Sequence, residues 1–340
     1  MPPKLLPRRT HDRADRDARR CVLLSVTAVT LCWPGVAAWA DTYPSKAVHL
    51  IVPFAPGGTS DIIARVVCER IAAELGRPMI VENRAGAGGA VGATEVARAV
   101  PDGYVLGLAT VSTTASNPAI NPKIAYDPIN DFTPIINVAA TPNVIAVHPK
   151  FPAHDYQGFI AELKRRPGTY SYSSSGTGGI AHLQMELFKS LTGTFVTHIP
   201  YRGSGPALND TVAGQVPMIF DNLPSALPFI KDSRLIAIAV AAPNRLAQLP
   251  DTPTFKELGL DAVNRMAYYG IYGPRGLPRA VVDKVNAAVK KTLEDPAVHK
   301  RIEDTGSLVI ANTPEQFAAQ IAAEYAVYKG VVATQKLKLE

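Results

Sequence analysis

Short apolar runs, glycine-rich loops and helix-forming stretches alternate along this chain, and this order limits its fold more than any other feature. Residues 48–52 (VHLIV) predict a buried strand, and the apolar spacing over 61–75 predicts a helix that Gly76 ends. The first unit is expected as strand, helix, strand, helix and strand at residues 48–52, 61–75, 79–81, 93–99 and 104–108. Such an order predicts an α/β fold with a largely parallel sheet.

The middle of the chain repeats this pattern. Strands are expected at 144–147, 170–173, 196–199, 218–220 and 235–240, and helices at 155–165, 181–191 and 206–213. The tail predicts a helix over 278–293 and a closing helix that starts at the capping box Thr313-Pro-Glu-Gln316. Two units of this kind predict two lobes, with chain crossovers near 137–147 and 265–273.

The first forty residues have the pattern of a secretory signal peptide. Six arginines precede an apolar run over 21–33, and Ala38-Trp39-Ala40 offers small residues at a cleavage site. Removing residues 1–40 takes away seven of the 35 basic and three of the 29 acidic residues, which leaves a net charge of +2. That balance gives no reason to expect a nucleic-acid partner. We expect cleavage after Ala40 and a periplasmic protein.

About 300 residues remain after cleavage, enough for two lobes of ordinary domain size. We expect residues 1–40 as signal peptide, residues 41–142 with 268–340 as the first lobe, and residues 143–267 as the second. Cys68 is the only cysteine left, so no disulfide forms within the mature chain. No Cys/His cluster has metal-ligand spacing, and we expect neither a metal nor a cofactor.

A loop suited to an anion follows the first predicted strand. Residues 53–61 (PFAPGGTSD) combine glycines, which let a ligand approach the backbone, with the start of a helix, whose free N–H groups attract negative charge. The absence of Gly-Lys-Ser/Thr excludes the phosphate loop of nucleotide hydrolases. A tight turn with a helix cap is the alternative.

Residues 173–179 (SSSGTGG) repeat that arrangement in the second unit, and His182 follows just inside the next helix. Ligands of open α/β sheets bind outside the carboxyl ends of strands, so the two loops are expected to face each other across a cleft. The serines also suggest a hydrolase, but no G-x-S-x-G elbow exists. His182 alone is more often a packed or capping residue than a base.

Other polar residues also follow predicted strands. Residues 110–116 and the segment 201–206 with Arg202, which could pair with a carboxylate, are two such places, and Asp221-Asn222 is a third. We expect the three tyrosines Tyr268, Tyr269 and Tyr272 in the core or at a hinge. The run 86–92 is one residue out of register with a dinucleotide fingerprint, so a structural loop is expected there.

Six motifs in this order resemble a known family. They are YPSK at 43–46, IVPFAPGGTSD at 51–61, ENRAGAGG at 82–89, PDGY at 101–104, YRG at 201–203 and GP at 273–274. The chain is similar over its whole mature length to the substrate-binding receptors of tripartite tricarboxylate transporters, also called Bug proteins. The resemblance implies a type II periplasmic binding fold, with two α/β lobes, a central ligand cleft and a C-terminal helix that spans both lobes.

The resemblance also implies a ligand carboxylate held between the two loops, with further pocket members from neighbouring segments. The candidate ligand-binding residues are Phe54, Ala55, Pro56, Gly57, Gly58, Asp61, Thr110, Ser112, Ser174, Ser175, Gly176, Thr177, Gly178, His182, Tyr201 and Asp221.

The predicted function follows from this resemblance. We expect a monomeric, non-enzymatic receptor that captures a small carboxylate, such as a dicarboxylate, an acidic amino acid or an aromatic acid, for inner-membrane transporter subunits. A secreted α/β hydrolase-like enzyme and a receptor for a sensor kinase are the alternatives.

Overall fold

The structure, a computed structural model, describes residues 43–338 and builds them around two sheets. The six-stranded sheet has the spatial order β11 (Leu308–Val309), β4 (Phe132–Thr141), β10 (Ala267–Pro274), β3 (Val105–Thr110), β1 (Val48–Val52) and β2 (Met79–Asn83). Strand β1 is parallel to β2 and β3, whereas β10 is antiparallel to β3 and β4. The signal peptide expected at 1–40 lies outside the described residues.

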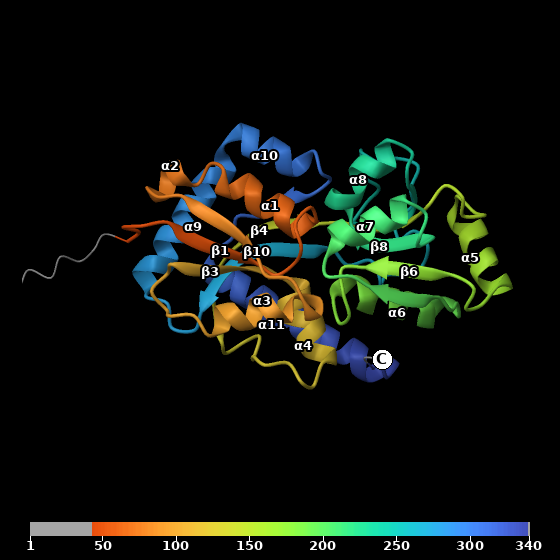
Figure 1. Cartoon of the computed structure of the whole chain (residues 1–340), viewed down its shortest axis with the longest axis horizontal. Coiled ribbons are helices and arrows are strands. Elements are labelled where there is room, and N and C mark those ends of the chain that lie inside the picture. The colour runs from red at the N-terminus through yellow and green to blue at the C-terminus, as the bar shows by residue number, and fades with distance from the viewer. Residues whose placement is uncertain (1–42, 339–340) are drawn as a thin grey trace, which may run out of the picture. The chain divides into compact units, whose positions relative to one another are not determined.

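The five-stranded sheet has the order β7 (Thr197–Pro200), β6 (Ser171–Ser174), β8 (Met218–Asn222), β5 (Asn143–Val147) and β9 (Ile236–Ala241). Strand β6 is parallel to both its neighbours, and β5 is antiparallel to its own. We call the part built on the six-stranded sheet the first lobe and the part built on the five-stranded sheet the second lobe (Figure 1). The expected fold class of two α/β lobes is confirmed.

Helices pack on both sheets. Those of the first lobe are α1 (Thr59–Cys68), α2 (Ala72–Leu75), α3 (Ala90–Ala97), α4 (Asn117–Ile120), α9 (Arg279–Glu294), α10 (Pro296–Glu303) and α11 (Pro314–Gln335), with short helical turns η1 (Ala87–Gly89) and η2 (Ser112–Ser116). Those of the second lobe are α5 (Tyr156–Arg165), α6 (Ile180–Thr192), α7 (Ser204–Val212) and α8 (Leu223–Lys231). Within residues 43–338, no helix is both long and apolar enough to cross a membrane.

Helix α11 contacts both lobes. Its capping box is formed, because Thr313 Oγ1 accepts from the Gln316 N–H and Gln316 Oε1 accepts from the Thr313 N–H. Phe317 is buried in the core of the first lobe, and near the other end Gln335 accepts a hydrogen bond from Ser190 of α6. The spanning C-terminal helix that the resemblance implied is therefore present.

Two expected crossovers turn out to contain strands. Residues 132–141 form β4, and the chain passes from it to β5 through Pro142 alone. Residues 267–274 form β10, a central strand of the six-stranded sheet, so Tyr268 and Tyr272 are core side chains. The lobe limits 41–142 with 268–340, and 143–267, stay a prediction.

The helix expected over 61–75 is wrong in its extent. It begins at Thr59, because the Gly58 carbonyl already accepts from the Asp61 and Ile62 N–H groups, and it ends at Cys68. A turn then leads to the short helix α2, which Gly76 ends in a left-handed conformation as expected. The apolar spacing continues through this turn, where the side chain of Ile71 is fully buried.

Candidate functional site

A small cavity lies between the lobes, at the carboxyl ends of parallel strands from both sheets. Its lining is Phe54, Gly58, Thr59, Ser60, Thr110, Val111, Ser112, Ser175, Ile180, Ser204, Asn222, Ala267 and Tyr269. The centre of a water-sized sphere can move through only about 10 Å³ of it, which is the space of about one water. The lobes are therefore closed on each other, and a ligand can enter only when they separate.

The first loop presents the start of α1 to this cavity. Gly58 is the extended residue before the helix, and Thr59 and Ser60 occupy the first turn and line the cavity. First-turn N–H groups have no carbonyl one turn before them, and the helix dipole adds positive potential there. This end of the cavity is suited to an anion.

Asp61 supports that loop and does not line the cavity. Its carboxylate accepts hydrogen bonds from the Gly57 N–H, at 3.2 Å, from Arg65 Nε, at 2.9 Å, and from Asn83 Nδ2, at 3.1 Å. Burial would raise the pKa of Asp61, but these bonds from Arg65, Gly57 and Asn83 outweigh it and hold the pKa below its ordinary value. The charged carboxylate thus fixes the loop from behind.

The second loop supplies Ser175 to the cavity, and the start of α6 supplies Ile180. The Ile180 N–H at the start of α6 donates to Ser112 Oγ of the first lobe, at 3.0 Å. Ser174 is fully buried and turns away from the cavity towards His198, and the Gly178 N–H donates to His182 Nδ1.

Five of the predicted site residues line the cavity, namely Phe54, Gly58, Thr110, Ser112 and Ser175.

Several other predicted residues lie where the lobes touch. The Ala55 N–H donates to the Arg202 carbonyl, at 3.1 Å, and Ser116 Oγ donates to the Gly178 carbonyl, at 3.0 Å. The remaining predicted residues at this seam are Pro56 and Gly57, which approach Gly205, and Gly176 and Thr177, which approach Gly88. These residues join the lobes and do not line the cavity in this closed arrangement.

Two predicted residues lie behind the cavity wall. Tyr201 donates its hydroxyl hydrogen to Asp210, and burial with that carboxylate raises the pKa of Tyr201 to about 12. Asp221 is fully buried and accepts from Ser204 Oγ, at 2.5 Å, and from Ser225 Oγ, at 2.7 Å. Burial raises the pKa of Asp221 to about 6, although the two serine hydrogen bonds oppose the shift.

Part of the lining could not be predicted from the sequence. Ser204 and Asn222 lie within the candidate segments 201–206 and 221–222, but which hydroxyl or amide faces the cavity depends on tertiary packing. Tyr269 was expected in the core or at a hinge, yet it lines the cavity and donates from its hydroxyl to Asn222 Oδ1, at 2.6 Å. Arg202, expected to pair with a carboxylate, is exposed and is not part of the lining.

The cavity wall is polar but uncharged. Among the described residues, its lining includes no Asp, Glu, Lys, Arg or His and contains hydroxyl groups, one amide and helix-start N–H groups. Such a site can hold an anion only through hydrogen-bond donors, without a cationic side chain.

A serine and a histidine do come together, but not as a catalytic pair. Ser174 Oγ lies 2.7 Å from His198 Nε2. Burial, with His182 and Lys189 nearby, lowers the pKa of His198 to about 3, which makes it a poor base at neutral pH. Ser174 is buried and out of reach of the cavity, so this geometry does not support the hydrolase alternative.

Comparisons with known proteins agree with this architecture. BugT of Bordetella pertussis is 34% identical over 321 residues, covering 94% of this chain and 98% of that protein. A solved periplasmic transporter is 54% identical with a TM-score of 0.86, covering 88% of this chain and all of the other.

Two further solved structures contain ligands. MatC from Rhodopseudomonas palustris with bound malate is 34% identical with a TM-score of 0.82, covering 85% of this chain and all of MatC. The R. palustris protein Rpa4515 with adipate is 31% identical with a TM-score of 0.83, covering 87% of this chain and 99% of that protein. The model of the tripartite tricarboxylate transporter family receptor matches residues 63–337. The chain belongs to this family of periplasmic solute-binding receptors, which are not enzymes.

Proposed function

We propose that the protein captures a small dicarboxylate in the cavity between its lobes. The observation that carries this proposal is the uncharged cavity at which the start of α1 meets the second loop and the hydroxyls of Thr110, Ser112 and Ser175. Each hydrogen bond to a charged group contributes about 1.5–3 kcal/mol, so a few such donors suffice for a buried carboxylate. Malate and adipate, the ligands of two related receptors, are both dicarboxylates.

Asp221 favours a ligand that carries a hydroxyl or ammonium group. Ser204 has a single hydroxyl hydrogen, and it donates this hydrogen to Asp221. Ser204 therefore presents lone pairs to the cavity and accepts hydrogen bonds there. A ligand hydroxyl can donate to it, whereas a second carboxylate at that point would be repelled. We infer that malate or aspartate binds better than succinate.

Periplasmic capture for membrane transporter subunits completes the proposal. It rests on the signal-peptide pattern of residues 1–40 and on the family of transporter receptors to which the chain belongs.

A thermal-shift panel tests the ligand class. Malate, aspartate, succinate, adipate, citrate, nicotinate and benzoate are each added in excess to the processed protein. A ligand at 100 times its Kd stabilises the fold by about 2.7 kcal/mol, and we expect this for malate or aspartate first. A panel in which no dicarboxylate raises the Tm, or in which only benzoate and nicotinate do, contradicts the proposal.

A further inference from the structure

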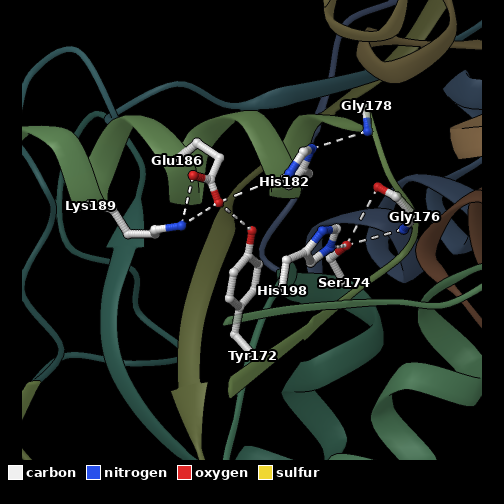
Figure 2. Close-up of polar contacts among 8 residues, drawn as sticks. All are labelled: Tyr172, Ser174, Gly176, Gly178, His182, Glu186, Lys189 and His198. Carbon is white, nitrogen blue, oxygen red and sulfur yellow. Dashed lines mark hydrogen bonds and ion pairs between the residues drawn. The ribbon is translucent and has the colours of Figure 1, made fainter. Parts of the chain in front are cut away.

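Behind the second loop lies a cluster of stacked rings that the ligand site does not use directly. His182 of α6 stacks on His198 of β7, with ring centroids 4.2 Å apart and planes 14° apart. Tyr172 of β6 stacks on His198 as well, at 4.8 Å and 20°. Figure 2 shows the two imidazoles and Tyr172 beside the turn from Ser174 to Gly178.

Each histidine contacts one end of the second loop. His198 Nε2 lies 2.7 Å from Ser174 Oγ, and that same oxygen accepts from the Gly176 N–H, at 3.1 Å. His182 Nδ1 accepts from the Gly178 N–H, at 3.1 Å (Figure 2). Ser175, which lines the cavity, lies between these two anchor points.

The contact with Gly178 fixes the proton on His182. A backbone N–H can only donate, so Nδ1 must offer a lone pair and the ring proton must be on Nε2. His182 is therefore neutral in this arrangement. A second proton would have to bind at Nδ1, directly opposite the Gly178 N–H, and would remove the hydrogen bond.

The groups around the rings act differently on the two imidazoles. The Glu186 carboxylate accepts from Lys189 Nζ and from the Tyr172 hydroxyl, and it lies 4.0 Å from His182 Nε2, where it would stabilise a charged His182. Burial, then His182 and Lys189, lower the pKa of His198 to about 3. Tyr172, Glu186 and Lys189 are titratable side chains that face the pair.

We propose that His182 and His198 are positioning residues that hold the ligand loop 174–179 in its binding conformation, and that protonating His182 releases the loop and lowers ligand affinity. The inference rests on the proposed function of that loop. Protonation of His182 would make the receptor a weaker binder in acid than at neutral pH, although His182 does not touch the ligand.

Hydrogen exchange of glycine amides tests the positioning without any ligand. In protein labelled with ¹⁵N-glycine at pH 7.5, His182→Ala should lower the protection factor of the Gly178 amide at least tenfold. His182→Asn should preserve it, because Asn Oδ1 replaces Nδ1 as acceptor. His198→Ala should lower protection at Gly176. His154→Ala is the matched control, since His154 lies in the same lobe and is exposed.

The acid response is measured on the wild type, so it does not depend on any variant folding. Between pH 7.5 and 5, the protection factor of Gly178, corrected for intrinsic exchange, should fall at least tenfold, while the amide of the remote Gly259 keeps its value. Unchanged protection at Gly178 both in acid and in His182→Ala overturns the inference.

Malate affinity supplies the functional readout. His182→Ala should raise the Kd for malate at least tenfold at pH 7.5, and His182→Asn should restore it to within about threefold of the wild type. Equal affinity in His182→Ala and wild type overturns the positioning role. If the wild type itself binds no dicarboxylate, the proposed function fails, and the exchange data still decide the inference.

Discussion

Glycine residues allow the two lobes to approach each other through their backbones. A Cβ atom added to Gly88 of the first lobe would lie 2.3 Å from the Thr177 carbonyl oxygen of the second lobe, far inside van der Waals contact. That carbonyl belongs to the ligand loop and cannot rotate away as a side chain would. The closed arrangement therefore requires a residue without a side chain at position 88.

Gly88→Ala should accordingly impair closure and ligand binding more than folding. Both Gly88, with φ +60°, and Gly76, with φ +84°, are left-handed, but a Cβ on Gly76 meets nothing within 4 Å. Gly76→Ala is therefore the matched control, and each substitution should cost about 1–2 kcal/mol of stability from backbone strain. Calorimetry with malate should show weaker binding only in Gly88→Ala. Equal Kd values in the two variants would mean that this contact is not needed for closure.

Asp221 makes the stability of the fold depend on pH. Burial raises its pKa from 3.8 to about 6 in the folded protein, so the fold binds this proton more tightly than the unfolded chain does. Its contribution to the free energy of unfolding is then lost as pH rises from about 4 to about 6, by an amount on the order of 2–3 kcal/mol.

Asp221→Asn should remove that pH dependence. The amide oxygen of the new Asn side chain keeps one of the two acceptors. The second acceptor is not needed, because Ser225 can donate instead to the Asn222 carbonyl, 3.0 Å away. Denaturant unfolding at pH 4 and pH 7 should show the variant gaining stability relative to the wild type at the higher pH. A constant difference between the two proteins across this range would refute the raised pKa.

At the scale of elements, α11 links the two lobes, and its start is set by local sequence. Thr313→Ala removes the acceptor for the Gln316 N–H and should cost about 1 kcal/mol. Thr313→Ser keeps the hydroxyl and should melt close to the wild type. The measurement is the Tm of each variant without ligand, and a Thr313→Ala variant as stable as Thr313→Ser would show that the capping box contributes nothing.

Local patterns explain which elements could be predicted from the sequence. Strand β1, helix α6 and the capping box depend on local patterns, and they were placed correctly to within one or two residues. Strand β10 was missed because Gly270 and Gly273 suggest a break. In the sheet, Gly270 instead makes room for the Phe317 ring of α11, which a Cβ there would meet at 2.4 Å. That contact joins residues 47 positions apart in sequence, which no local pattern contains.

The candidate site was predictable to a similar degree. Both loops were located, because glycines after a strand and before a helix are a local pattern. The orientation of Ser174 towards His198, and of Asp221 towards Ser204, depends on packing between elements, so the sequence could not separate lining residues from supporting ones.

For the whole molecule, the closed cavity predicts a hinge motion. The chain passes between the sheets through Pro142 and again before Ala267, and these are the places where rotation of the lobes would be absorbed. Small-angle scattering should give a smaller radius of gyration with a bound acid than without one, because the ligand-free protein can open. An identical radius in both states would indicate a cleft that stays closed.

The central claim is that carboxylate groups, held by uncharged donors, drive binding, and one calorimetric comparison tests it most directly. The best-binding acid of the panel is titrated beside its monoamide and its methyl ester at pH 7.5. Losing a set of hydrogen bonds to a charged group should weaken binding by at least about 2 kcal/mol, roughly 30-fold in Kd. We predict that loss for both derivatives, and affinities equal to that of the acid would contradict the claim.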